Sequence, residues 1–250
     1  MEEGKYIYCI IGTDEERNFG PIGIGGRGDE VVTIPYRDLS AVISNSPMTK
    51  YIISKENLTA HEIVIEKVMR DYTVLPVRFC TIALNAEEIR GLLKNRYIEF
   101  KHLLRDMDNK IELGVKALWR DMDLIFQEIT NENEEIKRLK ERILKSPRQA
   151  YYDKIAIGEI VQSALEAKKN KEGEEILSVL RKISIDYRTN MTYGDRMLLN
   201  AAFLVDKGRE KEFDSRMDEL ATKHEGRIKF SYVGPAPPYN FVNITIHLEG

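Results

Sequence analysis

The chain has 250 residues, of which 42% are hydrophobic and 32% charged, and its formal net charge at pH 7 is −3. This slight negative charge disfavours nucleic acid as a partner, because phosphate contacts require an excess of positive charge. The sequence contains no run of about 18 apolar residues, so no membrane span is predicted. The acidic start MEEGKYIYCI lacks the pattern of a signal peptide, and the two cysteines, Cys9 and Cys80, are few for a secreted chain, so we expect a reduced cytoplasmic protein.

Strands are predicted first at the N-terminus. Residues 6–11 are apolar at even and at odd positions, with 6, 8 and 10 on one face and 7, 9 and 11 on the other. This pattern is typical of a central strand covered on both faces. Two short strands follow at 31–36 and 39–44. A further strand is predicted over 74–82, where Pro76 favours an edge, an end or a bulge because proline cannot donate to a ladder.

Two helices are predicted around that last strand. The first starts at Ser54 or at Thr59, since Thr59 has a glutamate three positions later and so forms a capping box. If the helix starts at Thr59, Leu58 and Ile63 form the hydrophobic staple. The second helix covers 85–107 with a similar start signal.

The second part of the chain begins with a strand at 110–118, where apolar and polar residues alternate. A long, charged helical excursion then covers about 119–185. Ser146-Pro147 ends its first run, and Gly173 separates the last two of its helices. The chain returns to a strand at 197–205.

The C-terminal part contains a helix capped by Asp206 and ended by Gly226. Two alternating strands, 227–233 and 242–248, then flank the proline loop Gly234–Pro238. Proline fixes φ and removes a donor, so we expect this loop to be stiff and to lie outside any sheet ladder.

This order of elements favours an α+β fold with two ferredoxin-like modules and antiparallel sheets, the second carrying the helical excursion. A boundary close to 108 gives an N-terminal domain of residues 1–108 and a C-terminal domain of residues 109–250.

A nucleotide site is one possible interpretation of the glycine-rich string at 23–28, which satisfies G-x-G-x-x-G. Such a site needs a helix after the glycines to direct backbone N–H groups at the pyrophosphate. A strand-like run follows at 31–36 instead, so a glycine-rich surface turn is favoured over a nucleotide-using enzyme.

Other signals of chemistry are weak. The four histidines lie outside metal-ligand spacing of one another and of the cysteines, and Cys80 is more typical of a buried thiol than of a nucleophile. We therefore predict no enzymatic activity, no cofactor and no metal.

An RNA-binding module is a second alternative. Phe230 and Tyr232 have the two-residue spacing of the aromatics that stack bases in an RNA-recognition sheet. Lys229 and Pro235 depart from that motif, and the net charge is negative, so core packing of the two rings is favoured.

Two segments, V-L-P-V-R-F-C-T-I at 74–82 and Y-V-G-P-A-P-P-Y-N-F-V at 232–242, together resemble the signatures of the gas vesicle accessory proteins of the F and L type. The opening strand, residues 41–44 and His61 fit the same order, so the resemblance spans nearly the whole chain. The sequence departs from the family pattern at Cys80, where glycine is usual, and at Ala236, where tryptophan is common.

The resemblance implies a non-enzymatic role in gas vesicle assembly, in the cytoplasm or at the vesicle. It implies the gas vesicle shell protein and other accessory proteins as partners. An apolar shell subunit would be prone to aggregate before assembly, and a helper could shield it. A stiff loop could dock such a partner with little loss of entropy, although a purely structural loop is favoured. The candidate partner-binding residues are Arg78, Phe79, Tyr232, Pro235, Pro238 and Tyr239.

Overall fold

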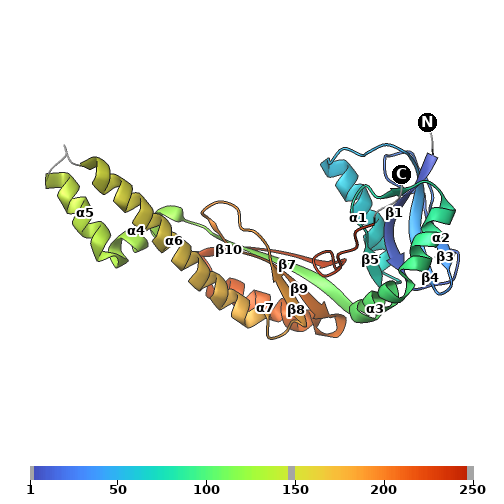
Figure 1. The fold of residues 1–250 in the computed structure, drawn as a ribbon. Coiled ribbons are helices and arrows are strands. Elements are labelled where there is room, and N and C mark those ends of the chain that lie inside the picture. The colour runs from blue at the N-terminus through green and yellow to red at the C-terminus, as the bar shows by residue number, and fades with distance from the viewer. Residues whose placement is uncertain (1–2, 146–149, 247–250) are drawn as a thin grey trace. The chain divides into compact units, whose positions relative to one another are not determined.

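The computed structural model describes residues 3–145 and 150–246 (Figure 1). The chain divides into two compact units: unit 1 comprises Met1–Glu112 and Gly234–Gly250, and unit 2 comprises Leu113–Val233. Both are mixed, with helices packed on antiparallel sheets, so the predicted α+β class is confirmed. The division into domains of residues 1–108 and 109–250 stays a prediction.

The sheet of unit 1 has the order β2-β3-β4-β1-β5, and β6 also pairs with β1. Strand β1 lies between β4 and β5 and is buried along almost its whole length, as its apolar residues at both parities predict. The strands are β1 Glu3–Ile11, β2 Asn18–Gly20, β3 Val31–Tyr36, β4 Leu39–Pro47, β5 Val74–Pro76 and β6 Ile82–Ala83.

Helices cover this sheet on both sides (Figure 1). Helix α1 (Lys55–Met69) packs against β1, β2 and β5, whereas α2 (Ala86–Asn95) packs against β3, β4 and β6. Helix α3 (Tyr97–Met107) contacts β5. The central strand is therefore covered on both faces, as predicted.

The predicted division of β1 into two faces is wrong beyond its middle. The pairing with β4 shifts between Ile7 and Cys9, which is a β-bulge. One extra residue in a strand reverses the alternation that follows it. Cys9 and Ile11 consequently join Tyr6 and Tyr8 in a single hydrophobic cluster.

Helix α1 starts after Ser54, whose hydroxyl accepts a hydrogen bond from Asn57 N, so the alternative start at Thr59 is wrong. The staple is also absent, because Leu58 and Ile63 are both exposed. The predicted helix 85–107 is capped by Asn85 as expected. It is two helices, because the backbone of Arg96 leaves the helical conformation between them.

The sheet of unit 2 has the order β10-β7-β9-β8. Its chain order, a strand, helices, two strands, a helix and a strand, is compatible with the predicted ferredoxin-like arrangement. The strands are β7 Lys110–Trp119, β8 Asp186–Thr189, β9 Met197–Asp206 and β10 Ile228–Ala236, and the helices are α4 Met122–Glu132, α5 Glu134–Lys145, α6 Ala150–Leu180 and α7 Glu210–Lys223.

The helical excursion differs from the prediction at Gly173. Helix α6 continues through this residue to Leu180. A side chain at Gly173 would lie 2.7 Å from the carbonyl oxygen of Leu198, so glycine is needed there for close packing of α6 on β9 and does not end the helix. The predicted stop at Ser146-Pro147 lies outside the described residues.

An ion-pair network links α4 and α6 to Arg227, the residue before β10. The guanidinium of Arg227 donates hydrogen bonds to the carboxylates of Glu128 and Glu172, at 2.7 to 3.1 Å. Lys168 pairs with Glu128, and Trp119 Nε1 donates to Glu172. The Arg227 and Lys168 charges keep the pKa of Glu128 at about 2, although partial burial opposes this.

The C-terminal strand prediction is wrong for the described residues. Residues 242–246 contain an isolated bridge from Ile244 to Val77 in place of a strand, although Val242 and Ile244 are buried. Strand β10 instead extends through Pro235 to Ala236. Because β10 is an edge strand, a residue without an N–H is tolerated there, so the expected exclusion of this proline from the strand is also wrong.

Candidate partner-binding surface

The first signature segment lies in unit 1, beside the residues that directly follow the second signature segment. Segment 74–82 is a strand only at Val74–Pro76 and Ile82–Ala83, with a turn between, because Cys80 has a left-handed φ of 65°. Val77 bridges Ile244 in parallel, and Arg78 Nη2 donates to Asn243 Oδ1 at 3.0 Å. The structure therefore brings exposed Arg78 next to the end of the second signature.

Phe79 points inward. Its ring contacts the rings of His61 and Tyr6, with centroids 5.8 and 6.4 Å away. Phe79 thus supports the turn from beneath, whereas Arg78 is exposed to solvent.

The backbone at Cys80 adopts a conformation that favours glycine. Its φ of 65° lies in the left-handed region, which glycine adopts without strain. The backbone N–H of Cys80 donates to the Tyr6 hydroxyl at 2.8 Å, and its Sγ accepts from Tyr51 N at 3.2 Å. The residue departs from the family pattern, but the turn that the pattern requires is present.

Tyr6 and His61 form a buried polar pair that the sequence analysis did not identify. The Tyr6 hydroxyl lies 3.0 Å from His61 Nδ1. The same hydroxyl accepts from Cys80 N, so it links His61 to the turn at Cys80. Burial lowers the pKa of His61 to about 4, against the opposing effect of the Val77 backbone.

Tyr8 anchors the glycine-rich turn. Its hydroxyl accepts from Ile24 N at 2.7 Å and lies 2.8 Å from Ser44 Oγ. Gly23 N donates to the carbonyl of Asp29, and strand β3 follows the turn. Two N–H groups that a phosphate would need are thus occupied, which supports the surface-turn interpretation.

The proline loop is docked on unit 1 through Asn240. Its backbone N–H and side-chain amide donate to the carboxylate of Glu112 at 2.8 and 2.6 Å. Pro238 is buried, Pro235 is exposed, and Tyr239 is 36% exposed. No sequence pattern points to Glu112, because the alternation of its strand predicts a solvent-facing position.

Tyr232 and Phe230 do not form a base-stacking platform. The ring of Tyr232 stacks on Phe213 of α7 at 5.8 Å, and its hydroxyl donates to Asp214. Phe230 contacts His224 at the end of the same helix. In an RNA-recognition sheet the aromatics face the ligand, whereas these rings face α7, so this geometry disfavours the RNA alternative.

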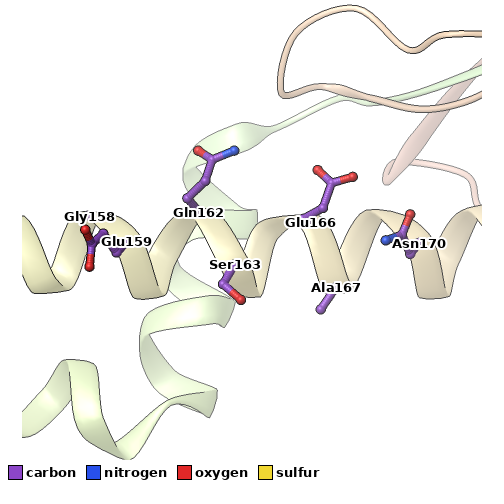
Figure 2. Close-up of a pocket in the computed structure, with 7 residues that line it drawn as sticks. All are labelled: Gly158, Glu159, Gln162, Ser163, Glu166, Ala167 and Asn170. Atoms are coloured by element: carbon purple, nitrogen blue, oxygen red, sulfur yellow. The ribbon is translucent and has the colours of Figure 1, made fainter.

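Other surface features offer little chemistry. A shallow depression along α6 is lined by one exposed flank of this helix, with Gly158, Ser163 and Ala167 among its residues (Figure 2). Among the described residues, no helix is long and apolar enough to cross a bilayer, and no three potential metal ligands gather.

The chain resembles named gas vesicle proteins along almost its whole length. It is 27% identical to gas vesicle protein F1 of Halobacterium salinarum, over 100% of this chain and 97% of the relative. It is 28% identical to gas vesicle protein F of a Streptomyces species, over 95% of this chain and 98% of the relative.

Solved structures share the fold. The crystal structure of GvpF from Anabaena superposes with a TM-score of 0.83 at 23% identity and covers 98% of this chain and 100% of its own. The crystal structure of GvpF from Microcystis aeruginosa superposes with a TM-score of 0.80 at 22% identity and covers 96% of this chain and 99% of its own. A family profile described as gas vesicle synthesis protein GvpL/GvpF matches residues 4–243. The chain therefore belongs to the GvpL/GvpF family of gas vesicle synthesis proteins.

Proposed function

We propose that this protein is a non-enzymatic assembly factor that binds the gas vesicle shell subunit and cooperates with other gas vesicle accessory proteins. The family match over residues 4–243 carries this proposal. We also propose that it acts in the cytoplasm and at the vesicle, without cofactor or metal.

The proposed contact surface is the signature surface of unit 1, which we define as Arg78, Asn243, Ile52 and Ile53. The hydrogen bond from Tyr51 N to Cys80 Sγ places the two isoleucines beside the signature turn. They are 80% and 77% exposed, which is unusual for adjacent large apolar side chains. An apolar subunit fits this combination of aliphatic side chains and one guanidinium.

The other candidate residues have distinct proposed roles. Phe79 and Pro238 shape the surface from beneath, because both are turned toward the interior of unit 1. Tyr239, Pro235 and Tyr232 remain proposed contacts because each keeps exposed surface.

The test is co-purification of the tagged chain with the shell subunit of the same organism. We expect the double substitution Ile52→Asp/Ile53→Asp to reduce capture of the subunit at least about tenfold, since buried apolar anchors dominate interfaces. Arg78→Ala should weaken capture less. Ile98→Asp and Arg105→Ala are matched controls, because both residues are exposed elsewhere on unit 1.

Failure of the wild-type chain to capture the subunit would contradict the proposed function. Equal losses for the signature-surface and control variants would instead contradict the assignment of this surface.

A further inference from the structure

Strand β8 is the outer strand of the second sheet. It follows β9 in the order β10-β7-β9-β8, and within residues 3–145 and 150–246 no strand pairs with its other side. An outer strand presents unpaired backbone groups that can bind another strand. The neighbouring Ile185 and Met191 are large, apolar and exposed.

The pairing with β9 identifies the outward-facing groups. Asp186 pairs with Leu204 and Arg188 with Ala202 in an antiparallel register, and Asn190 N donates to Asn200 O just beyond the strand. In such a ladder, residues that bond the neighbouring strand alternate with residues whose N–H and C=O point away from it. The backbone N–H and C=O groups of Tyr187 and Thr189 therefore point toward the free edge of the sheet.

Two side chains occupy the outward groups of Tyr187. Asp186 Oδ1 accepts from Tyr187 N at 2.8 Å, and Arg188 Nη1 donates to Tyr187 O at 3.0 Å. The two side chains also pair with each other, with Arg188 Nη2 2.8 Å from Asp186 Oδ2. We call this arrangement the edge clip. Both of its side chains are about half exposed, so the clip opens at small cost.

We propose that β8 is a strand-pairing surface whose occupant is β8 of a second copy of this chain, in an antiparallel register centred on Tyr187. Charge complementarity favours this partner. In that register Asp186 lies opposite Arg188 of the second copy, and Arg188 opposite Asp186 of the second copy, so two cross-strand ion pairs form. A slide of two residues, which moves the centre of the register to Arg188, would place the two Arg188 side chains opposite each other and is disfavoured.

Each contact of the clip has an equivalent between copies. Tyr187 N donates to Tyr187 O of the second copy in place of Asp186, and the ion pair forms across the interface in place of within one strand. Ile185 N already donates to Leu204 O within the chain at 2.8 Å. The gain therefore comes from the outward N–H of Thr189, which donates to the second copy, and from covering the exposed Ile185. Because the strand is short, we expect weak, concentration-dependent dimers. This inference does not rest on the proposed function.

Sedimentation velocity of the full chain over a concentration series tests the proposal. The wild-type sedimentation coefficient should rise toward that of a dimer with concentration. Thr189→Pro lacks the outward N–H but loses no bond to β9, so it should stay monomeric. Thr189→Val keeps the N–H and is the matched control, and circular dichroism checks that each variant is folded.

Charge exchange tests the register. Asp186→Arg and Arg188→Asp should each weaken dimerisation about tenfold or more. An equimolar mixture of the two variants should form heterodimers, and the double variant Asp186→Arg/Arg188→Asp should dimerise like the wild type.

Three results would overturn the proposal: a wild-type chain that is monomeric throughout, a Thr189→Pro variant that still dimerises, or a double variant that fails to recover. If the wild type stayed monomeric while Thr189→Pro lost capture of the shell subunit, the edge would bind that partner and not a second copy.

Discussion

The buried carboxylate of Glu112 accepts two hydrogen bonds from Asn240, one from the backbone N–H and one from the side-chain amide. This relationship ties the proline loop to the first residues of β7. Burial raises the pKa of Glu112, while the Asn240 hydrogen bonds oppose that rise. The stiff loop is therefore positioned by one polar contact as well as by its prolines.

Asn240→Ala should reduce the free energy of unfolding by about 2–3 kcal/mol, because it removes the side-chain donor to a buried carboxylate. Thermal denaturation followed by circular dichroism measures the change. Asn243→Ala is the matched control: it removes one exposed hydrogen bond in the same segment and should cost less than about 0.5 kcal/mol. Similar losses for both variants would contradict the role assigned to Glu112.

Arg227→Met should destabilise unit 2 by about 2 kcal/mol, because it leaves Glu128 and Glu172 without their shared guanidinium. Trp119, the single tryptophan, donates to Glu172, so its fluorescence during urea unfolding reports on this network. Arg216→Met, which removes an exposed pair on α7, is the control.

The same network predicts a dependence on pH. The pKa of Glu128 is lowered to about 2 in the folded protein, so its stabilisation is present above the unfolded value of about 4.3. Stability should then fall as pH decreases from there toward 2. In Arg227→Met this slope should be smaller, and an unchanged slope in urea titrations at several pH values would show that other carboxylates cause it.

Substitutions at Cys80 should follow its left-handed backbone. Glycine relieves about 1 kcal/mol of backbone strain at this position. It also increases the entropy of the unfolded chain and removes the contact of Sγ with Tyr51 N. Cys80→Gly should therefore leave the free energy of unfolding nearly unchanged. Cys80→Val should cost more than about 2 kcal/mol, because a β-branched side chain fits this conformation poorly. Melting temperatures in the order Gly, Ala, Val from highest to lowest would agree, and a stable valine variant would not.

His61 should remain neutral well below neutral pH. Its pKa is lowered to about 4 by burial, so the unfolded chain binds a proton between about pH 6.5 and 4 that the folded chain does not. Stability should fall as pH decreases through this window, and His61→Gln should reduce that slope. The imidazole resonances, followed by NMR, should show no titration above pH 5.

The sequence determined the features that depend on local periodicity and caps. Strands at 110–118 and 197–205, the start of α2 at Asn85 and the α+β class follow from alternation and capping residues, which act within a few positions. The family resemblance was carried by the same kind of local signature. Edge placement of Pro76 was also predictable, since a missing N–H excludes a central ladder.

Only the tertiary structure decided which long-range partner each residue meets. The bulge in β1, the passage of α6 through Gly173 and the burial of Glu112 depend on segments far away in the chain, and no local pattern encodes them. Phe230 and Tyr232 have the spacing of a base-stacking pair, but α7 decides which way they face. Side-chain periodicity specifies a face, and packing alone specifies what covers it.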